Sequence, residues 1–329
     1  MCFIVPDRPG MIYLALMKLF FASLALAAAC AAQVKLTQAS DRIRIEIDGK
    51  HFSDYMISAS LAKPFLHPLR TASGVQITRS FPMDLVEGEK RDHPHHRGLW
   101  FSHGDVNGYD FWANETSQKG VGKGRGEIKV VKVRDLKNGK KSGSLSTLQD
   151  WIDATGKKLL TESRTMTFYS DPALRTIDFD ITLTAVEESV FGDTKEGVFA
   201  IRLIRALEED SSGLMTNANG AENEKNVWGK RSPWVDYAGT LNGEKIGVLI
   251  LDHPSNPRHP TYWHSRAYGL FASNIFGVKD FTRDKSATGG SLTLKPGESA
   301  RFRFRVIIHP GDTKSFDPAA AFQKFSLFK

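Results

Sequence analysis

The sequence is poor in cysteine, and this shortage limits the chemistry available to the protein. Its 329 residues contain two cysteines, Cys2 and Cys30. If an N-terminal segment is cleaved after residue 31 or 32, no thiol remains. Disulfides, cysteine-ligated zinc and a cysteine nucleophile are then excluded. The remaining residues 33–329 are enough for one large β domain or two smaller ones, and such a domain must rely on its core for stability.

A secretory leader is predicted at the N-terminus. From Met17 the chain has a basic start, an apolar run and small residues at a cleavage point, which is the layout of a signal peptide. The apolar run is too short for a transmembrane helix. We therefore expect residues 1–32 to be a leader with its start at Met17, residues 33–329 to be a single domain, and the protein to be periplasmic or secreted. Two alternatives stay open: a retained membrane anchor and a lipoprotein attached through Cys30.

Several well-known signatures are also missing. There is no Walker loop, and the glycines of residues 120–124 lack the strand-then-helix setting of a nucleotide site. Gly-x-Ser-x-Gly and His-Glu-x-x-His are absent. No cofactor is predicted, although a divalent metal held by histidine with aspartate or glutamate stays an alternative because the spacing is not diagnostic.

The net charge of +7 comes from basic residues scattered among acids. The densest basic stretches, residues 129–141 and 301–305, alternate with apolar residues, as solvated strand faces do. Nucleic-acid binding is therefore not expected. A preference for anionic ligands is compatible with this charge.

Alternation of apolar and polar residues with a period of two dominates the chain after the leader. It is clearest over residues 176–183 and 301–306. Strands are expected at residues 42–47, 126–133, 144–153, 159–169, 175–185, 198–203, 245–251 and 291–308. One short helix is expected over Pro318–Phe328, with Asp317 as its N-cap. This pattern predicts an all-β protein of packed antiparallel sheets.

Seven of the ten histidines lie in two short windows, residues 92–112 and 252–266. Histidine suits proton transfer and metal ligation because its unperturbed pKa lies near neutrality. Both windows resemble loops at strand ends, where a rigid sheet can position polar groups. We therefore expect the two windows to meet in one polar site with aromatic walls.

The first window has the composition of a sugar site. In an extended chain His93 and His95 would converge while His96 points away. Planar hydrogen-bonding groups suit sugar hydroxyls and aromatic rings suit the C–H faces of a sugar; the candidates here are Arg97, Asp105, Asn107, Asp110 and Trp112. The alternative is a packed corner in which the histidines bond to backbone carbonyls.

The second window is stiffened by three prolines and follows an apolar strand, which suits the wall of a site. Its candidate binding residues are His253, Asn256, Arg258, Trp263, His264 and Arg266. A rigid surface loop is the alternative.

Two carboxylates outside these windows are candidate bases. Asp236 follows Trp234, a further candidate binding residue, and its aromatic neighbours could raise its pKa by desolvation. Glu196 precedes the strand expected at 198–203 and is the best isolated glutamate for general-base catalysis. The alternatives are a turn carboxylate for Asp236 and an exposed turn acid for Glu196.

Several motifs resemble one bacterial family. The chain reads Lys-Pro-Phe-Leu at 63–66, Asp-His-Pro-His-His-Arg-Gly at 92–98, Trp-Val-Asp-Tyr at 234–237 and Asn-Ile-Phe-Gly at 274–277. Together with residues 105–112 and 252–266, these motifs resemble the "methane oxygenase PmoA" domain family over nearly all of the mature chain. The activity in that name does not fit, because a membrane-embedded copper monooxygenase subunit needs several spanning helices.

More distantly, the order of strands and the closing run of residues 294–311 are similar to galactose-mutarotase-like supersandwich proteins. This resemblance implies an antiparallel β supersandwich with a carbohydrate site on a concave face. It also implies a histidine acid with a glutamate base, although no motif maps those residues one to one.

The sequence thus predicts an exported enzyme that acts on a carbohydrate or modified sugar by hydrolysis, elimination or epimerisation. In this hypothesis His96 or His103 donates a proton and Glu196 or Asp236 accepts one. Two alternatives remain: a non-catalytic carbohydrate-binding protein and a metal-dependent enzyme of unassigned chemistry.

Overall fold

Two antiparallel sheets of eight strands each make up the fold. The computed structural model describes residues 1–3 and 33–328, and residues 33–328 lie in one compact unit. The predicted signal peptide from Met17, with Cys30, falls outside the described residues. In the described part of the chain, no helix combines the length and hydropathy needed to cross a membrane.

The first sheet carries the N-terminal strands and the two histidine windows. In spatial order it contains β1 (Val34–Gln38), β2 (Arg42–Ile47), β3 (Lys50–Met56), β4 (Phe65–His67), β5 (Leu99–His103), β11 (Gly197–Arg202), β16 (Leu270–Asn274) and β15 (Tyr262–Trp263). Hydrogen-bonded neighbours are antiparallel throughout.

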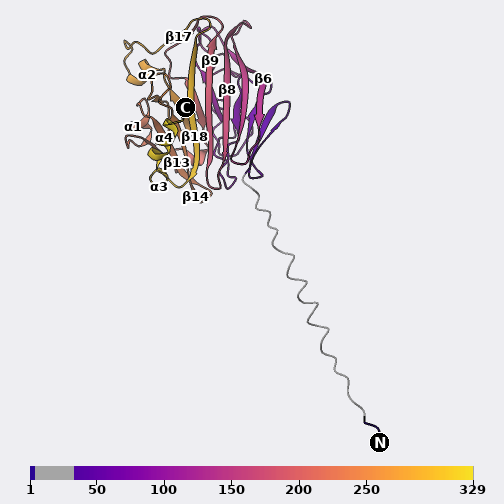
Figure 1. Cartoon of the computed structure of the whole chain (residues 1–329). Helices are drawn as coiled ribbons and strands as arrows, with labels where there is room; N and C mark the ends of the chain where they lie inside the picture. Colours follow the sequence, from indigo (N-terminus) through magenta and orange to yellow (C-terminus); the bar gives the residue numbers. More distant parts are fainter. Residues whose placement is uncertain (4–32, 329) are drawn as a thin grey trace. The chain divides into compact units, whose positions relative to one another are not determined.

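The second sheet contains the long strands, which lie side by side in Figure 1. Its order is β12 (Leu214–Asn217), β13 (Trp234–Leu241), β14 (Glu244–Asp252), β18 (Ser299–Pro310), β9 (Arg175–Ala185), β8 (Lys158–Ser170), β7 (Ser142–Ile152) and β6 (Glu127–Lys137). A separate antiparallel pair is formed by β10 (Ser189–Phe191) and β17 (Leu292–Leu294). The predicted all-β class of packed antiparallel sheets is therefore confirmed.

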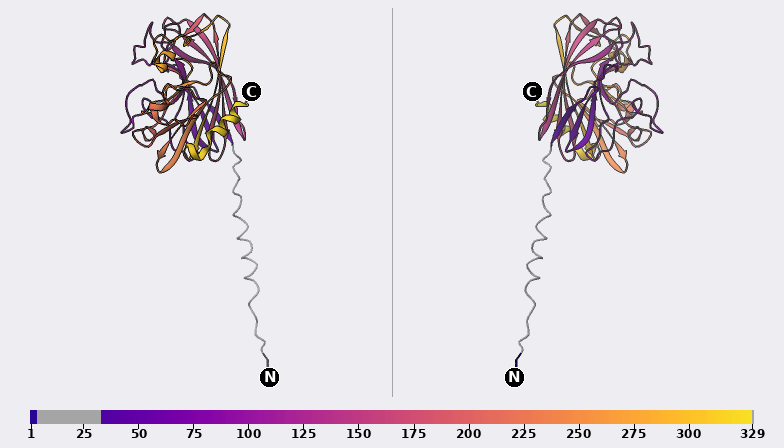
Figure 2. Two further views of the ribbon diagram at one scale, coloured as in Figure 1. Left: turned by 90° about the vertical axis from the view of Figure 1, so that its left-hand side faces the viewer. Right: turned by 90° about the vertical axis from the view of Figure 1, so that its right-hand side faces the viewer.

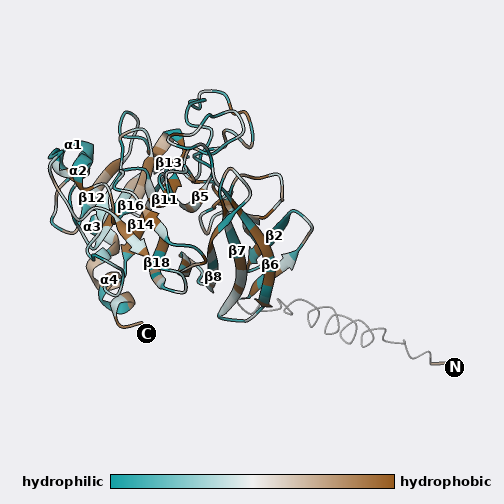
Figure 3. Ribbon diagram, turned by 90° about the horizontal axis from the view of Figure 1, so that it is seen from above, coloured by the Kyte–Doolittle hydropathy of each residue, from teal (hydrophilic) through white to brown (hydrophobic). Residues whose placement is uncertain are grey.

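The hydrophobic core lies between the two sheets and is rich in aromatic contacts. Phe199 of β11 stacks on Phe304 of β18 with ring centroids 4.4 Å apart, and it meets Phe179 of β9 at 4.8 Å. Phe101 of β5 lies 5.4 Å from Phe302. Hydrophobic and hydrophilic stretches alternate along the strands in Figure 3, as a sheet with one core face requires.

Short helices cover part of the second sheet. They are α1 (Asn223–Val227), α3 (Thr313–Phe316) and α4 (Pro318–Ser326), whereas Phe281 of α2 (Val278–Thr282) packs on Tyr262 of β15 in the first sheet. The predicted C-terminal helix is confirmed as α4, whose N-cap Asp317 accepts a hydrogen bond from the backbone of Ala320 at 3.0 Å. Phe325 of this helix packs on Trp234 and Leu249 of the sheet, and the yellow helix lies beside the strands in Figure 2.

The outer face of the first sheet has a hydrophobic patch of its own. Trp100 of β5 and Ala200 of β11 pack there with Trp112, which comes from the loop after β5. Their neighbours Phe101 and Phe199 point to the opposite face, into the core, because side chains alternate along a strand. This outer patch supports the site described below.

The expected strands match the observed ones closely, with one division. Strands β2 and β9 have the expected bounds, while the stretch 291–308 divides into β17 and β18 at the turn of residues 295–298. The expected strands did not include β1, β3, β4, β5, β10, β12, β13, β15 or β16, most of which are short.

Replacing Phe199 by alanine should test the contact between the sheets. Because Phe199 is fully buried and touches two strands of the opposite sheet, we expect Phe199→Ala to lower the free energy of unfolding by about 3–5 kcal/mol. Urea denaturation measures this loss. Leu85→Ala, at a side chain that is 63% exposed, should change it by less than about 0.5 kcal/mol. Equal effects of the two variants would contradict the described core.

Candidate functional site

A pocket of about 500 Å³ lies on the outer face of the first sheet, and both histidine windows contribute to it. It brings together eight of the predicted site residues: His93, His95, His96, Asp110, Trp112, Glu196, His264 and Arg266. The expectation that the two windows meet is therefore confirmed for these residues. We call this hollow the histidine pocket.

A tight turn gathers the three histidines of the first window. The amide of His96 donates to the carbonyl of His93 at 3.0 Å, so the chain turns where an extended segment was expected. His96 consequently stacks on His93 with centroids 4.7 Å apart and meets His95 at 4.4 Å. The expectation that His96 points away from the other two is wrong for this reason.

Glycine is required immediately after this turn. Gly98 has a φ of 53°, and a Cβ at this position would collide with the carbonyl oxygen of Leu66. The absence of a side chain thus lets the start of β5 approach β4.

Two of the pocket imidazoles have a fixed tautomer. The Arg202 guanidinium donates to Nδ1 of His96 at 3.1 Å, and the Trp228 indole donates to Nδ1 of His264 at 2.9 Å. Guanidinium and indole groups can only donate, so each Nδ1 is an acceptor and the ring proton of the neutral imidazole lies on Nε2. Within residues 33–328, neither Nε2 atom has a hydrogen-bond partner.

His95 follows the same arrangement. The side-chain amide nitrogen of Gln118 donates to its Nδ1 at 2.8 Å, which again leaves the proton on Nε2. In the described structure no group binds the Nε2 of His95. The pocket therefore contains three imidazoles whose Nε2–H groups are available to a ligand.

Burial keeps these three imidazoles neutral. Desolvation lowers the pKa of His95 to about 2 and that of His264 to about 3, and it holds the pKa of His96 well below its ordinary value. At neutral pH these rings are hydrogen-bond donors and do not carry an extra proton. The predicted role of His96 as a proton donor conflicts with this neutral state.

His93 differs from its neighbours because it contacts a carboxylate. Its Nδ1 lies 3.1 Å from Asp92, and its exposed ring stacks on Tyr268 at 5.5 Å. Burial alone would raise the pKa of Asp92, but the nearby charges of Arg202, His93 and Arg79 lower it overall. Asp92 therefore stays ionised beside the His93 ring.

Glu196 lies directly before β11 and lines the pocket with its neighbour Lys195. The two side chains form an ion pair, and each is about one-third exposed. The carbonyl of Glu196 accepts a hydrogen bond from the amide of Gly104 at 2.7 Å, which fixes the backbone beside the pocket. A carboxylate that can accept a proton thus shares the pocket with the imidazole donors.

Hydrogen bonds from below hold the Trp112 wall. Asp110 accepts from the amides of Trp112 and Ala113 at 2.8 Å each, and burial raises the pKa of its carboxyl. The buried ammonium of Lys63 donates to the carbonyl of Trp112 at 2.8 Å and to Asn114 at 2.6 Å. Asp110 therefore shapes the loop, although it also lines the pocket.

His103 lies outside the histidine pocket. It follows Phe101 by two positions on β5, so its side chain points toward the inner face of the sheet. There it contacts Phe276 at 4.3 Å, and its Nε2 lies 2.9 Å from the carbonyl of Gly192. Burial lowers its pKa to about 4. This position agrees with a packed histidine.

Three further candidates from the first window hold loops together. Arg97 makes two hydrogen bonds of 2.8 Å to the Glu115 carboxylate. Asp105 accepts from the amide of Gly108 at 2.9 Å, and Asn107 accepts from the amide of Val190 at 2.7 Å.

Asp236 and Trp234 belong to β13 of the other sheet and point to its outer face. The Asp236 carboxylate lies 3.3 Å from Nε2 of His309, and both side chains are fully buried. His309 in turn stacks on Phe316 of α3. The expectation that Asp236 lines the same cleft as the histidines is wrong, because Asp236 and the pocket lie on different sheets.

Four other candidates of the second window are likewise structural. His253 binds the carbonyl of Phe328 at 3.0 Å, and Asn256 donates to Asp252 at 2.7 Å. Arg258 donates to backbone carbonyls of residues 290 and 291, and the buried Trp263 donates to that of residue 232. None of these four side chains lines the histidine pocket, where they were predicted to bind the ligand.

Sequence reasoning missed further residues that line or support the pocket, among them Gln118, Thr194, Lys195, Arg202, Trp228 and Tyr268. Arg202 gave one usable signal, because a lone arginine ends the apolar run of β11. Lys195 and Tyr268 gave only their closeness in sequence to Glu196 and Arg266.

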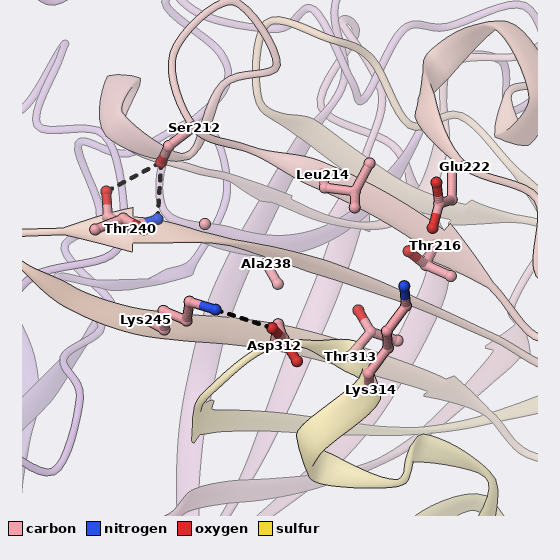
Figure 4. Close-up of a pocket in the computed structure, with 11 residues that line it drawn as sticks. Ser212, Leu214, Thr216, Glu222, Ala238, Thr240, Lys245, Asp312, Thr313 and Lys314 are labelled. Atoms are coloured by element: carbon pink, nitrogen blue, oxygen red, sulfur yellow. Dashed lines mark hydrogen bonds and ion pairs between the residues drawn. The ribbon is translucent and has the colours of Figure 1, made fainter.

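The described residues contain no group of three or more histidine, cysteine, aspartate or glutamate side chains arranged to hold a metal ion. A further hollow of about 250 Å³ lies over β12 and β13 near α3 (Figure 4). Two pairs of its polar groups bind each other: Ser212 with Thr240, and Lys245 with Asp312. It contains none of the predicted site residues.

The neutral histidines should make the fold sensitive to acid. His95, His96, His103 and His264 are uncharged when folded but take up protons when unfolded below pH 6.5, so stability falls as the pH falls toward the folded pKa values. Each should cost about 1 kcal/mol of unfolding free energy between pH 7 and 5.5. Urea denaturation of the wild type and of His103→Gln at pH 7 and 5.5 measures this loss. Between these pH values the free energy of unfolding of the variant should fall by about 1 kcal/mol less than that of the wild type. A stability that stays constant over the interval would contradict the neutral state of these rings.

Comparisons with known proteins place the chain in a family. Residues 42–323 match the model of a family of unknown function, DUF6807. No curated protein matches the chain.

Solved structures resemble the fold at a distance. A galactose mutarotase-like protein from Clostridium acetobutylicum has 12% identity over 85% of this chain and 99% of that protein, with a TM-score of 0.46. A putative aldose 1-epimerase from Escherichia coli has 11% identity over 84% of this chain and 99% of that protein, with a TM-score of 0.36. A GH36 α-galactosidase from Geobacillus stearothermophilus has 12% identity and a TM-score of 0.41, over 85% of this chain and 40% of the enzyme.

The family match spans nearly all of β2 to α4, whereas the name PmoA that the sequence resemblance carries is not confirmed. The chain belongs to the family of unknown function DUF6807.

Proposed function

We propose that the histidine pocket binds a carbohydrate and that the protein acts on it with His93 as proton donor and Glu196 as proton acceptor. The observation that supports this most is the set of three Nε2–H donors in one pocket with a carboxylate. Each sugar hydroxyl both donates and accepts a hydrogen bond, so fixed donors beside a carboxylate suit a polyol. The volume also lies within the range of about 300–1,000 Å³ usual for small-molecule sites.

Flat rings complete the match to a sugar. Trp112 and Tyr268 line the pocket, and Tyr268 continues the stack formed by His93 and His96. Aromatic faces bind the C–H faces of a sugar ring. The hydroxyls at the edge of the sugar can then bind the imidazoles and Arg266.

The neutral state of the buried histidines determines the division of roles. His95, His96 and His264 hold hydroxyl or ring oxygens through their Nε2–H groups. Glu196 accepts a proton from the ligand or from an attacking water, and His93, supported by Asp92, donates one to the departing or ring oxygen. One proton is taken and one is given, which balances hydrolysis, elimination or epimerisation.

We further propose that this chemistry takes place outside the cytoplasm, after the leader is removed.

A second candidate function is carbohydrate binding without turnover. The observation that favours it is that three of the four pocket histidines are held neutral, which suits hydrogen bonding more than proton transfer.

Variants at His93 and Glu196 separate the two candidates once a panel of oligosaccharides has been screened for products by mass spectrometry. With a substrate that is turned over, His93→Gln and Glu196→Gln should each lower kcat by roughly 10²–10⁴-fold, with the melting temperature kept. His51→Gln on β3, remote from the pocket, is the matched control and should retain wild-type kcat.

Wild-type turnover in both pocket variants would rule out the acid–base proposal. Sugars that bind without being converted would favour the binding protein. If no sugar on the panel is bound or converted, the carbohydrate proposal itself fails.

A further inference from the structure

A second hollow of about 570 Å³ adjoins the histidine pocket. Arg266 lines both. The two are also joined through a hydrogen bond, because Trp228 of the second hollow donates to His264 of the histidine pocket at 2.9 Å. A ligand that extends past Arg266 from one hollow would enter the other.

The second hollow is strongly basic. Four cations line it, Lys225, Lys230, Arg266 and Arg283, against the single acid Glu224, which leaves an excess of three positive charges. We call it the basic hollow.

In the basic hollow, the acid and one of the four cations are paired, while the other three cations have no carboxylate partner among the described residues. Glu224 is already engaged, because it forms an ion pair with Arg266, 2.9 Å from its Nε, and accepts a hydrogen bond from the amide of Ala267 at 2.6 Å. Within residues 33–328, no carboxylate forms an ion pair with Lys225, Lys230 or Arg283. Three exposed cations therefore remain around one concave surface.

An aromatic wall accompanies these cations. Trp228 and Phe281 meet edge to face, with centroids 5.3 Å apart, and both line the basic hollow. The indole N–H of Trp228 is used by His264, so only the apolar ring of Trp228 remains for a ligand. The surface thus combines apolar faces with donors that cannot accept hydrogen bonds, which suits a group bearing anionic oxygens.

We propose that the basic hollow binds an anionic substituent, a carboxylate or a sulfate ester, of the carbohydrate whose ring occupies the histidine pocket. This inference rests on the proposed function and narrows its substrate class to acidic sugars. Neutral sugars would leave three like charges uncompensated beside the site, whereas an anionic group in the basic hollow would offset part of this charge. Because these cations are exposed, salt should weaken the preference.

Isothermal titration calorimetry with matched sugars tests the proposal. The pairs are digalacturonate with galactobiose, and lactose 6′-sulfate with lactose, so that the two arms distinguish carboxylate from sulfate. In at least one pair the acidic member should bind about tenfold more tightly at low ionic strength. In Lys230→Gln/Arg283→Gln this preference should shrink to about twofold or less, with the affinity for the neutral member unchanged.

The matched control is Lys132→Gln/Arg134→Gln, which removes two exposed cations from β6 and should retain the full preference. Melting temperatures confirm that all variants fold. Equal binding of acidic and neutral sugars by the wild type, or a preference that survives in Lys230→Gln/Arg283→Gln, would overturn the inference and leave the proposed function standing. If no sugar in either pair binds, the inference fails, and the full oligosaccharide panel decides whether the proposed function fails with it.

Discussion

The site depends on one buried cation, the guanidinium of Arg202. It ends β11 on the outer face of the first sheet, where it donates to His96 at 3.1 Å and to Asp92 at 3.2 Å and lies over the ring of Tyr268 at 4.7 Å. Burying an unpaired charge costs several kcal/mol, so Arg202 requires Asp92 and the nearby Glu208. The same contacts fix the tautomer of His96, the position of the histidine turn and the ionised state of the carboxylate beside His93.

This constraint leads to a division between binding and proton transfer. A positive charge next to His96, added to burial, makes a second proton on that ring unfavourable. The buried imidazoles can then offer hydrogen bonds of constant direction over the neutral pH range. In the proposed function, proton exchange is assigned to the more exposed groups of the pocket, His93 and Glu196. The burial that lowers stability in acid also keeps these hydrogen-bond donors in one protonation state over the neutral pH range.

The sequence predicted the long strands β7, β8 and β9 well because period-two alternation is a local property, and it survives in β9 without a break. It missed most strands of the first sheet, which are short or buried on both faces. It predicted the meeting of the two histidine windows because both follow or contain strands. It could not place His103 or Asp236, because the face on which a residue lies depends on strand register and on the sheet that a strand joins. Lys195 and Arg202 were missed since their roles depend on contacts with residues far away in the chain.

The strand β11 serves the core and the pocket with alternate residues: Phe199 and Ile201 face inward, while Ala200 and Arg202 face outward. A shift by a single residue would exchange the two faces, placing an arginine in the core and an isoleucine beside the histidines. Evolution of this site is therefore restricted in an uneven way. An insertion in β11 would disrupt the hydrophobic core and the pocket at once, whereas the exposed side chains of Thr116, Ser117 and Lys119, in the loop after Trp112, make none of the contacts described above. New ligand specificities in related proteins should accordingly arise through changes in the loops around the pocket, with β11 left intact.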